Sequence, residues 1–554
     1  MIEMHIPTTT DVLIVGAGPT GLTLAIQLVR SGVSCRIIDT APAPTDKSKA
    51  LAVQARTLEI FATMGIADAA IDGGIRAGGF NFYARGRPLG HARFTADPDT
   101  PYPYILLLAQ SETERILIDR LASLGVQVER GVTMTTFRQD TSGVTATLSR
   151  ADAPEETVRA HWLTGCDGAH SAVRHGLHMP FAGSDYEDLY WLADVHVQWP
   201  LAADEVHGFL GARGLLFAFP IAAPDRYRLI ARWDGAAREA TADPTLADMQ
   251  AVMDAIGPAG ATLSDPVWLT AFRLHHRKVT RFRVDRVFLA GDAAHIHSPA
   301  GGQGMNTGIQ DAYNLAWKLA LVIRGKADDA LLDSYDTERG AVAAQVLRQT
   351  DLMFRAMTVQ SAPLRAIRDR LLPFLIARRA FIRRMQRTIG ELDIRYRRSP
   401  IVAEDGRRSG PHAGTRAPDA PLVAAPPGGA TTLWQVCRES EPLHATLLFF
   451  SGLASSHGDF QRLAAIGHMV RERYDHDIAA YLIVTGENAA AESPWGGPRY
   501  DDPASAAHRR YGITAPALLL IRPDGYIGFR SQPANGNALR DYLDRIFTPH
   551  EATQ

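Results

Sequence analysis

Glycines at fixed spacing near the start of the chain could hold the phosphates of a dinucleotide. The apolar run 11–15 leads directly into Gly16, Ala17, Gly18, Pro19, Thr20 and Gly21. Because such glycines leave backbone N–H groups uncovered where a helix begins, they predict a pyrophosphate site, the alternative being a plain turn. Asp39 ends the next apolar run and could accept hydrogen bonds from a ribose, unless it is only a surface carboxylate.

Two further turns combine glycine with aspartate. Asp167 and Gly168 follow an apolar stretch and alone would predict only a turn. Gly291 and Asp292 follow the short apolar run 287–290, and a glycine-rich segment, 301–306, comes before a helical pattern at 310–323. This arrangement could place a carboxylate for sugar or ribityl hydroxyls, and backbone N–H groups for an anion or an electron-rich ring edge.

The elements around these turns predict an α/β chain of several units. Residues 11–39 have the strand, helix, strand pattern of a βαβ unit. Residues 216–219 and 227–231 predict a hairpin in a second sheet. After a segment rich in Pro and Gly at 402–432, predicted to be a linker, alternating strand and helix patterns indicate another small α/β unit.

Composition excludes several classes of protein. The 554 residues suggest three or more structural units, and 58 basic against 60 acidic residues give no global attraction to nucleic acid or anionic lipid. Cys35, Cys166 and Cys437 form no CxxC, which favours a cytoplasmic protein without disulfides. No apolar run or signal peptide indicates a membrane or secreted protein. His295 and His297 have no third ligand nearby, so we expect no metal site.

Arginines concentrate in one late segment. Residues 365–398 contain eleven arginines and three acids, interleaved with leucine and phenylalanine. The segment could be a surface for an anionic partner or another subunit. A solvated helical face with arginine stems packed on the body is the simpler interpretation.

The three turns, in this order and spacing, resemble the three motifs of the single-component FAD-dependent aromatic hydroxylases over about residues 10–400. They are most similar to members that act on phenols, hydroxyphenylpropionates and aromatic polyketides, which share strings such as 55–59 and 301–306. The segment after the linker resembles the thioredoxin-like domain of many of these enzymes. Without a CxxC we expect it to pack or to stabilise a dimer rather than to exchange disulfides, with a cis-proline position at Pro516.

The resemblance implies an α/β fold with three parts. A Rossmann-like FAD-binding domain takes residues 1–180 and 275–400, with a helical C-terminal part. It is interleaved with a mixed-sheet substrate domain of residues 181–274 and part of 75–110. The linker of 402–432 then leads to a thioredoxin-like α/β domain of residues 433–554.

The resemblance also implies a set of FAD contacts. They are Gly16, Ala17, Gly18, Pro19, Thr20, Gly21, Asp39, Lys49, Arg56, Gln110, Asp167, Asp292, Gly302, Gly304, Met305 and Asn306. Asp167 would also lie near a transient NAD(P)H site, with Arg174 anchoring its turn. Asp39 replaces the glutamate that is usual in the family, and Lys49 stands where arginine is common, so FAD retention could be weaker.

The implied activity is hydroxylation of a phenolic substrate. NADPH or NADH would reduce FAD, O₂ would add at flavin C4a, and the hydroperoxide would transfer oxygen to the ring. Arg213 and Pro299 are the candidates on the substrate side, while the residue that deprotonates the substrate is not identified. Alternatives are epoxidation, Baeyer–Villiger or decarboxylative oxygenation, and a non-catalytic flavin-binding interaction protein. A homodimer is a possible assembly.

Overall fold

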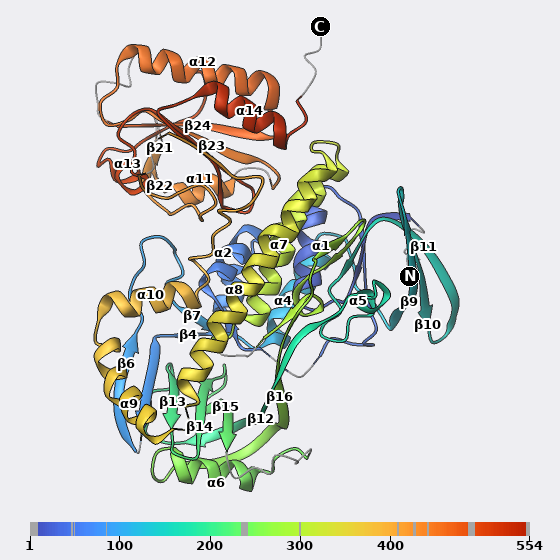
Figure 1. The fold of residues 1–554 in the computed structure, drawn as a ribbon, viewed down its shortest axis with the longest axis vertical. Helices are drawn as coiled ribbons and strands as arrows, with labels where there is room; N and C mark the ends of the chain where they lie inside the picture. Colours follow the sequence, from blue (N-terminus) through green and yellow to red (C-terminus); the bar gives the residue numbers. More distant parts are fainter. Residues whose placement is uncertain are drawn as a thin grey trace.

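The computed structural model describes residues 9–45, 48, 50–84, 86–233, 242–297, 301–359, 361–406, 409–424, 428–439, 442–485 and 494–549. Two predicted site residues, Lys49 and Pro299, lie outside these ranges. Figure 1 shows three parts, each around its own large sheet, with α7 and α8 running between the upper part and the lower one. Among the described helices, none has both the length and the apolarity that crossing a membrane requires.

The first sheet carries the βαβ unit. Its strands have the order β17-β18-β11-β1-β2-β8, and β9 and β10 extend it beside β11. The parallel pairs β1–β2, β1–β11 and β11–β18 end at one edge of the sheet. Their bounds are β1 (Thr9–Val15), β2 (Cys35–Asp39), β8 (Glu129–Arg130), β9 (Val132–Asp140), β10 (Gly143–Arg150), β11 (Ala153–Gly165), β17 (Arg283–Val284) and β18 (Val287–Leu289).

Helices and a small sheet surround this core. Helix α1 packs against α4 and α7, which buries Leu22, Ile26 and Leu315 completely. The helices are α1 (Pro19–Arg30), α2 (Ala55–Met64), α3 (Ala67–Asp72), α4 (Gln110–Ser123), α5 (Ala172–Gly176), α7 (Gly304–Ile323) and α8 (Asp333–Met357), with 3-10 turns at Gly291–Ala293 and Asp329–Leu332. The small sheet consists of β3 (Ala52–Val53), β4 (Ile75–Ala77) and β7 (Ile105–Leu107).

The second sheet is the predicted substrate sheet, in the order β19-β16-β12-β15-β14-β13-β5-β6. Helix α6 (Leu246–Ile256) buries Met249, Val252 and Met253 against one face. At the β6 edge lie α9 (Ala362–Ile376) and α10 (Arg379–Ile389), in the lower left of Figure 1. The strands are β5 (Gly79–Ala84), β6 (Arg87–Arg93), β12 (Ala182–Gln198), β13 (Val206–Leu210), β14 (Gly214–Pro220), β15 (Arg226–Trp233), β16 (Thr262–Lys278) and β19 (His295–Ile296).

The C-terminal unit has a sheet in the order β20-β27-β26-β23-β24-β25-β21-β22. Its strands are β20 (Ala403–Gly406), β21 (Pro421–Ala424), β22 (Ala430–Thr432), β23 (Ala445–Phe450), β24 (Ile478–Val484), β25 (Arg499–Asp501), β26 (Ala517–Ile521) and β27 (Ile527–Gln532). Its helices are α11 (Leu433–Glu439), α12 (His457–Tyr474), α13 (Ala506–Tyr511) and α14 (Gly536–Ile546).

Two expectations about this unit need correction. The predicted linker, 402–432, supplies strands β20, β21 and β22, two of which form the edges of the sheet. Its prolines are compatible with this role because a proline at the first position of a strand, as Pro421 is in β21, removes no interior ladder bond. The described cis peptide bond is Gln532–Pro533, not the bond before Pro516.

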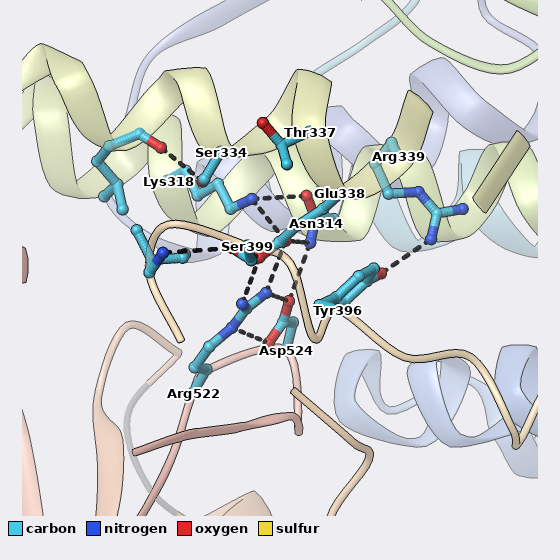
Figure 2. Close-up of polar contacts among 12 residues, drawn as sticks. Asn314, Lys318, Ser334, Thr337, Glu338, Arg339, Tyr396, Ser399, Arg522 and Asp524 are labelled. Atoms are coloured by element: carbon cyan, nitrogen blue, oxygen red, sulfur yellow. Dashed lines mark hydrogen bonds and ion pairs between the residues drawn. The ribbon is translucent and has the colours of Figure 1, made fainter. Parts of the chain in front are cut away.

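Buried charges join the C-terminal unit to the first part (Figure 2). The Glu338 carboxylate on α8 accepts hydrogen bonds from Lys318 Nζ at 2.8 Å, Arg522 Nη1 at 2.6 Å and Ser399 Oγ at 2.6 Å. Arg522 also donates to the Asp524 carboxylate, and the four charged side chains are at most 2% exposed. Although burial alone would raise it, Arg522 and Lys318 hold the pKa of Glu338 far below its usual value.

Candidate cofactor and substrate site

The three predicted turns meet at the carboxyl ends of β1, β11 and β18. A Cβ atom added to Gly16 would lie 2.4 Å from the Cys166 carbonyl oxygen, so the first and second turns are in direct contact. A Cβ on Gly291, where φ is +60°, would lie 2.7 Å from Thr20 Oγ1, so the first and third turns also touch. Turns that are 275 residues apart therefore form one surface.

Arg174 fastens the second turn to the third. Its Nη2 donates to the Ala169 carbonyl at 2.8 Å and its Nη1 to the Ala293 carbonyl at 3.1 Å. The guanidinium also stacks over the Phe181 ring, 4.1 Å from its centroid. The expectation that Arg174 anchors its turn is confirmed, and the side chain holds a second turn as well.

The first turn is closely packed at Gly21 and open at Gly18. A Cβ on Gly21 would lie 2.0 Å from the Gly16 carbonyl oxygen, whereas one on Gly18 would meet no protein atom within 4 Å. Gly18 has extended backbone angles, Pro19 follows at the first helical position, and no side chain caps α1. This cradle fits a pyrophosphate, because backbone N–H groups and the positive helix end face open space.

Asp39 holds the same turn in place. Its carboxylate accepts hydrogen bonds from the Ala17 N–H at 2.7 Å and the Ala41 N–H at 2.8 Å, and Arg130 Nη1 lies 3.7 Å away. The aspartate side chain, which is shorter than the glutamate usual in the family, therefore reaches the backbone of the glycine turn. Its remaining lone pairs can accept from ribose hydroxyls.

The aspartates of the other turns lie differently. Asp167 is half-buried, its Oδ2 accepts from the Val173 N–H at 3.2 Å, and its Oδ1 has no hydrogen-bond partner in the described chain. Burial raises the pKa of Asp167. Asp292 is exposed between the buried residues Gly291 and Ala293. Asp167 Oδ1 thus retains acceptor capacity, and Asp292 lies on the exposed side of the third turn.

The glycine-rich turn before α7 is clamped to β3. Gly301 and Gly302 have φ of +89° and +62°, which glycine adopts without strain. Asn306 Nδ2 donates to the Ala52 and Gly302 carbonyls, and its Oδ1 accepts from the Gln54 N–H. The Asn306 side chain therefore shapes this turn.

The helix itself begins beside this clamp. No side chain caps α7, whose first residues are Gly304 and Met305. The N–H groups of its first turn remain available to an electron-rich ring edge.

Sequence reasoning missed Asp311, which fixes the third turn. Its Oδ2 accepts from the Gly291 N–H at 3.0 Å and lies 2.7 Å from His295 Nε2, while Oδ1 accepts from Arg339 Nε at 2.6 Å. Although burial alone would raise it, Arg339 and His295 hold the pKa of Asp311 below its usual value. The available signal was an acidic side chain on the buried face of an otherwise apolar helix.

Arg56 lies away from the turns, at the contact with the C-terminal unit. Its Nη1 donates to Glu59 Oε2 at 2.8 Å and its Nη2 to the Asp524 carbonyl. Glu59 also pairs with Arg416. The i, i+3 spacing in α2 favours the pair with Glu59, and the guanidinium lies at the contact with the C-terminal unit.

Gln110 and Arg213 occupy contrasting places. Gln110 begins α4, where its side chain accepts from the Ala50 N–H at 3.1 Å and donates to Glu114 at 2.9 Å. Arg213 lies in the exposed turn between β13 and β14 and stacks on Trp233, 4.8 Å from the ring centroid. Arg213 is therefore not part of the cavity described next.

A cavity of about 230 Å³ separates the 48–51 segment from the second sheet. Its walls are Ser48, Leu51, Ala109, Ser111, Asp194, Ile221, Arg226, Arg228, Val267 and Trp268. Leu51 precedes Ala52, which contacts the turn at Gly302, so the cavity lies close to the start of α7.

Arg228 is held rigidly in this wall. It donates from Nε and Nη2 to the two Asp194 oxygens at 2.8 and 2.6 Å, and its Nη1 has no partner in the described chain. The guanidinium lies 5.4 Å from the Trp268 ring centroid. Sequence reasoning did not select it, because a strand arginine without a visible partner gives no local signal.

Comparison with known proteins agrees with this geometry. Residues 9–350 match the family model described as an FAD binding domain. The chain is 34% identical to pentachlorophenol 4-monooxygenase of Sphingobium chlorophenolicum over 97% of its own length and 96% of that protein. It is 35% identical to 6-methylpretetramide 4-monooxygenase of Streptomyces rimosus over 98% and 94% of the two lengths.

Solved structures agree in fold. The structure of an anhydrotetracycline hydroxylase from Streptomyces rimosus superimposes with a TM-score of 0.73 at 32% identity, covering 98% of this chain and all of that one. The matching family model, the long relatives and the three converging turns lead to one conclusion. The chain belongs to the FAD-dependent aromatic hydroxylases of the FAD-binding-domain family.

Proposed function

We propose that the protein uses FAD and NADPH or NADH to hydroxylate a phenolic or polycyclic aromatic compound. The carrying observation is the convergence of the three turns that contain Gly16, Asp167 and Gly291, together with a cavity that is walled by the second sheet and lies close to the start of α7. Relatives named for pentachlorophenol and for 6-methylpretetramide support an aromatic substrate. Bound FAD would supply the activation of O₂ after its reduction by the nicotinamide.

In this proposal the chain positions groups and does not form bonds with the substrate. The first turn and Asp39 would hold the FAD pyrophosphate and adenosine ribose, and Asp292 the ribityl or pyrophosphate segment. The uncapped start of α7 would stabilise negative charge on the reduced ring through its N–H groups. Asp167, with its unpaired buried oxygen, would face the flavin and the transient nicotinamide.

Arg228 is our candidate for recognising a substrate oxygen. Its bidentate pair with Asp194 fixes the guanidinium, and Nη1 remains as a donor for a phenolate, carbonyl or carboxylate oxygen. A phenolate oxygen held this way leaves the ring electron-rich, as electrophilic oxygenation needs. Trp268 and Leu51 would exclude water beside the ring.

We further propose that the C-terminal unit is thioredoxin-like and serves in packing. Its central strands have the order β27-β26-β23-β24, with β23–β24 parallel and both β23–β26 and β26–β27 antiparallel. Burial raises the pKa of the Cys437 thiol to about 12, which disfavours thiolate chemistry. The buried network around Glu338 attaches the unit to the first part of the chain, which agrees with a role in packing.

The test is a turnover experiment on the FAD-loaded protein. We expect NADPH or NADH oxidation to accelerate with a phenolic substrate, with equimolar O₂ consumption and a product heavier by one oxygen atom that originates from ¹⁸O₂. Arg228→Lys keeps the charge beside Asp194 but removes the planar fork, so KM should rise more than kcat falls. A protein that retains no FAD would contradict the proposal.

Product structure separates this proposal from its alternatives. An epoxide, a lactone from ring-oxygen insertion, or loss of CO₂ would assign the same scaffold to epoxidation, Baeyer–Villiger or decarboxylative oxygenation. FAD binding without substrate-dependent NAD(P)H oxidation across a panel of phenols and polycyclic aromatics would favour the non-catalytic interaction protein.

A further inference from the structure

Helix α9 exposes its apolar side chains to solvent. Leu364, Ile367, Leu371, Phe374 and Leu375 are 54, 53, 51, 55 and 36% exposed. Their spacing places them on one side of the helix, so they form a continuous band, here named the α9 stripe. Of the eight large apolar side chains that are exposed in the described chain, five belong to this band.

Contacts of other α9 side chains with the body of the protein fix this orientation. Arg365 Nη1 donates to the Ala212 carbonyl at 3.3 Å, and Arg368 Nη1 donates to the Met357 carbonyl at 2.8 Å. Ile376 fills the space above Gly90, where an added Cβ would lie 2.1 Å from Ile376 Cδ1. Arg365, Arg368 and Ile376 therefore hold α9 against the body of the protein and leave the α9 stripe facing outward.

Positively charged arginines border the α9 stripe. The exposed arginines of this region are Arg370, Arg378, Arg379, Arg383 and Arg384, and no carboxylate of the described residues forms an ion pair with them. The single acid between residues 361 and 389 is Asp369, which pairs with Arg368 at 2.8 Å. The local charge is thus strongly positive, although the chain as a whole has a net charge of −2.

An apolar stripe with a positively charged rim favours some binding partners over others. A second copy of the chain would bring two arginine rims together with no carboxylates to neutralise them, at a cost in desolvation and repulsion. An anionic bilayer supplies apolar chains for the stripe and negative headgroups for the rim, and an exposed apolar helix face can enter its interface. We propose that the α9 stripe docks the enzyme onto the surface of anionic membranes, a property beyond its proposed reaction.

The test is vesicle binding by the FAD-loaded full-length protein, which needs no turnover. Vesicles of phosphatidylcholine with about one third phosphatidylglycerol should bind at least about tenfold more strongly than phosphatidylcholine alone, and added salt should weaken the binding. Leu371→Asp with Phe374→Asp should reduce binding by at least about tenfold. Arg383→Glu with Arg384→Glu should remove the preference for anionic vesicles.

Leu453→Asp is the matched control. Leu453 is a comparably exposed leucine in the C-terminal unit, 48% exposed, and its substitution should leave binding unchanged. Equal binding to both vesicle types, or equal loss in the control and the stripe variants, would overturn the proposal. So would a concentration-dependent dimer that Leu371→Asp dissociates while the wild type ignores vesicles, because the stripe would then be a subunit interface.

Discussion

The glycine turns at the edge of the first sheet and the charged contact between α8 and the C-terminal unit are built in opposite ways. The turns rely on backbone that approaches backbone, with Gly16 against Cys166 and nothing above Gly18. The contact relies on long side chains, with Glu338 held by Lys318 and Arg522. The turns leave space for a ligand above Gly18, whereas the buried charges of the contact find their partners within the protein.

Because the two regions are built differently, substitutions in one should affect ligand binding and substitutions in the other should affect stability. Removing one partner from a buried ion network leaves the others desolvated and unpaired, so the contact should dominate the free energy of unfolding. Adding one methyl group above an open glycine should leave folding nearly intact and exclude the ligand. The substitutions below test this division of roles.

The largest effect should come from Glu338→Ala. Lys318, Arg522 and Ser399 would lose a shared acceptor inside a fully buried site, which should cost about 3–5 kcal/mol of unfolding free energy. Urea denaturation followed by circular dichroism measures the loss. The control is Glu112→Ala, whose exposed pair with Arg115 should contribute below about 1 kcal/mol. Equal losses in the two variants would mean that the network does not hold the parts together.

Next in size is a pH effect at Glu391, beneath the first turns of α7. Thr307 Oγ1 donates to its Oε1 at 2.9 Å, Gln310 contacts Oε2, and Arg339 and Asp311 lie nearby. Burial raises the pKa of Glu391 to about 8 from 4.5. The folded state therefore keeps a proton that the unfolded state releases, and stability falls as pH rises from about 5 to about 8.

Glu391→Gln should remove this slope. The variant stays neutral at every pH, so it should gain about 3 kcal/mol over the wild type between pH 5 and pH 7.5. Gln310 Oε1, which has no partner in the described chain, offers an acceptor for the new amide. Urea denaturation at several pH values measures both slopes. Parallel slopes would mean that Glu391 is ionised in the folded protein.

Gly18→Ala should have a smaller effect on free energy but a specific one. Its backbone angles, φ −78° and ψ −177°, suit alanine, and the new methyl group would meet no protein atom within 4 Å. The methyl group would occupy the space proposed for the pyrophosphate, so FAD affinity should fall at least about tenfold. Titration of the apoprotein with FAD, followed by flavin fluorescence, measures the change.

The matched control for that titration is Gly458→Ala in α12. Its added Cβ would also be uncrowded, 3.8 Å from Ser456 Oγ, but it is in the C-terminal unit. Unchanged FAD affinity in both variants would refute the assignment of the cradle.

The same comparison explains what the sequence could predict. The turns were predictable because strand, glycine turn and helix follow each other within a few residues, and only the contact between turns needed the structure. Glu338, Ser399 and Arg522 come from distant segments, so no local pattern reveals their network. The linker prediction failed because Pro and Gly signal turns but say nothing of the strands between them, as Pro421 shows at the start of β21.

Arg56 and Arg228 illustrate why the role of a single side chain is hard to predict from the sequence. Both are buried arginines, and family resemblance favoured the first while nothing favoured the second. The hydrogen-bond partners determine where each guanidinium lies. Arg56 donates to Glu59 and the Asp524 carbonyl at the contact with the C-terminal unit, whereas Arg228 donates to Asp194 on the neighbouring strand and lies in the cavity wall. An arginine has five donors in a fixed fork, so its role depends on acceptors that tertiary structure supplies.

The smallest effect is expected at Arg213, the sequence-based candidate on the substrate side. Its side chain is exposed and stacks on Trp233, an interaction that contributes about 0.5–1 kcal/mol at such sites. Arg213→Ala should therefore change stability by no more than that and leave kcat/KM for the aromatic substrate unaltered, whereas Arg228→Lys raises KM. Steady-state kinetics of both variants with one substrate decides between the two positions. A KM increase in Arg213→Ala alone would return the substrate contact to the turn between β13 and β14, and would place recognition in an exposed region, not in the rigid wall of the cavity.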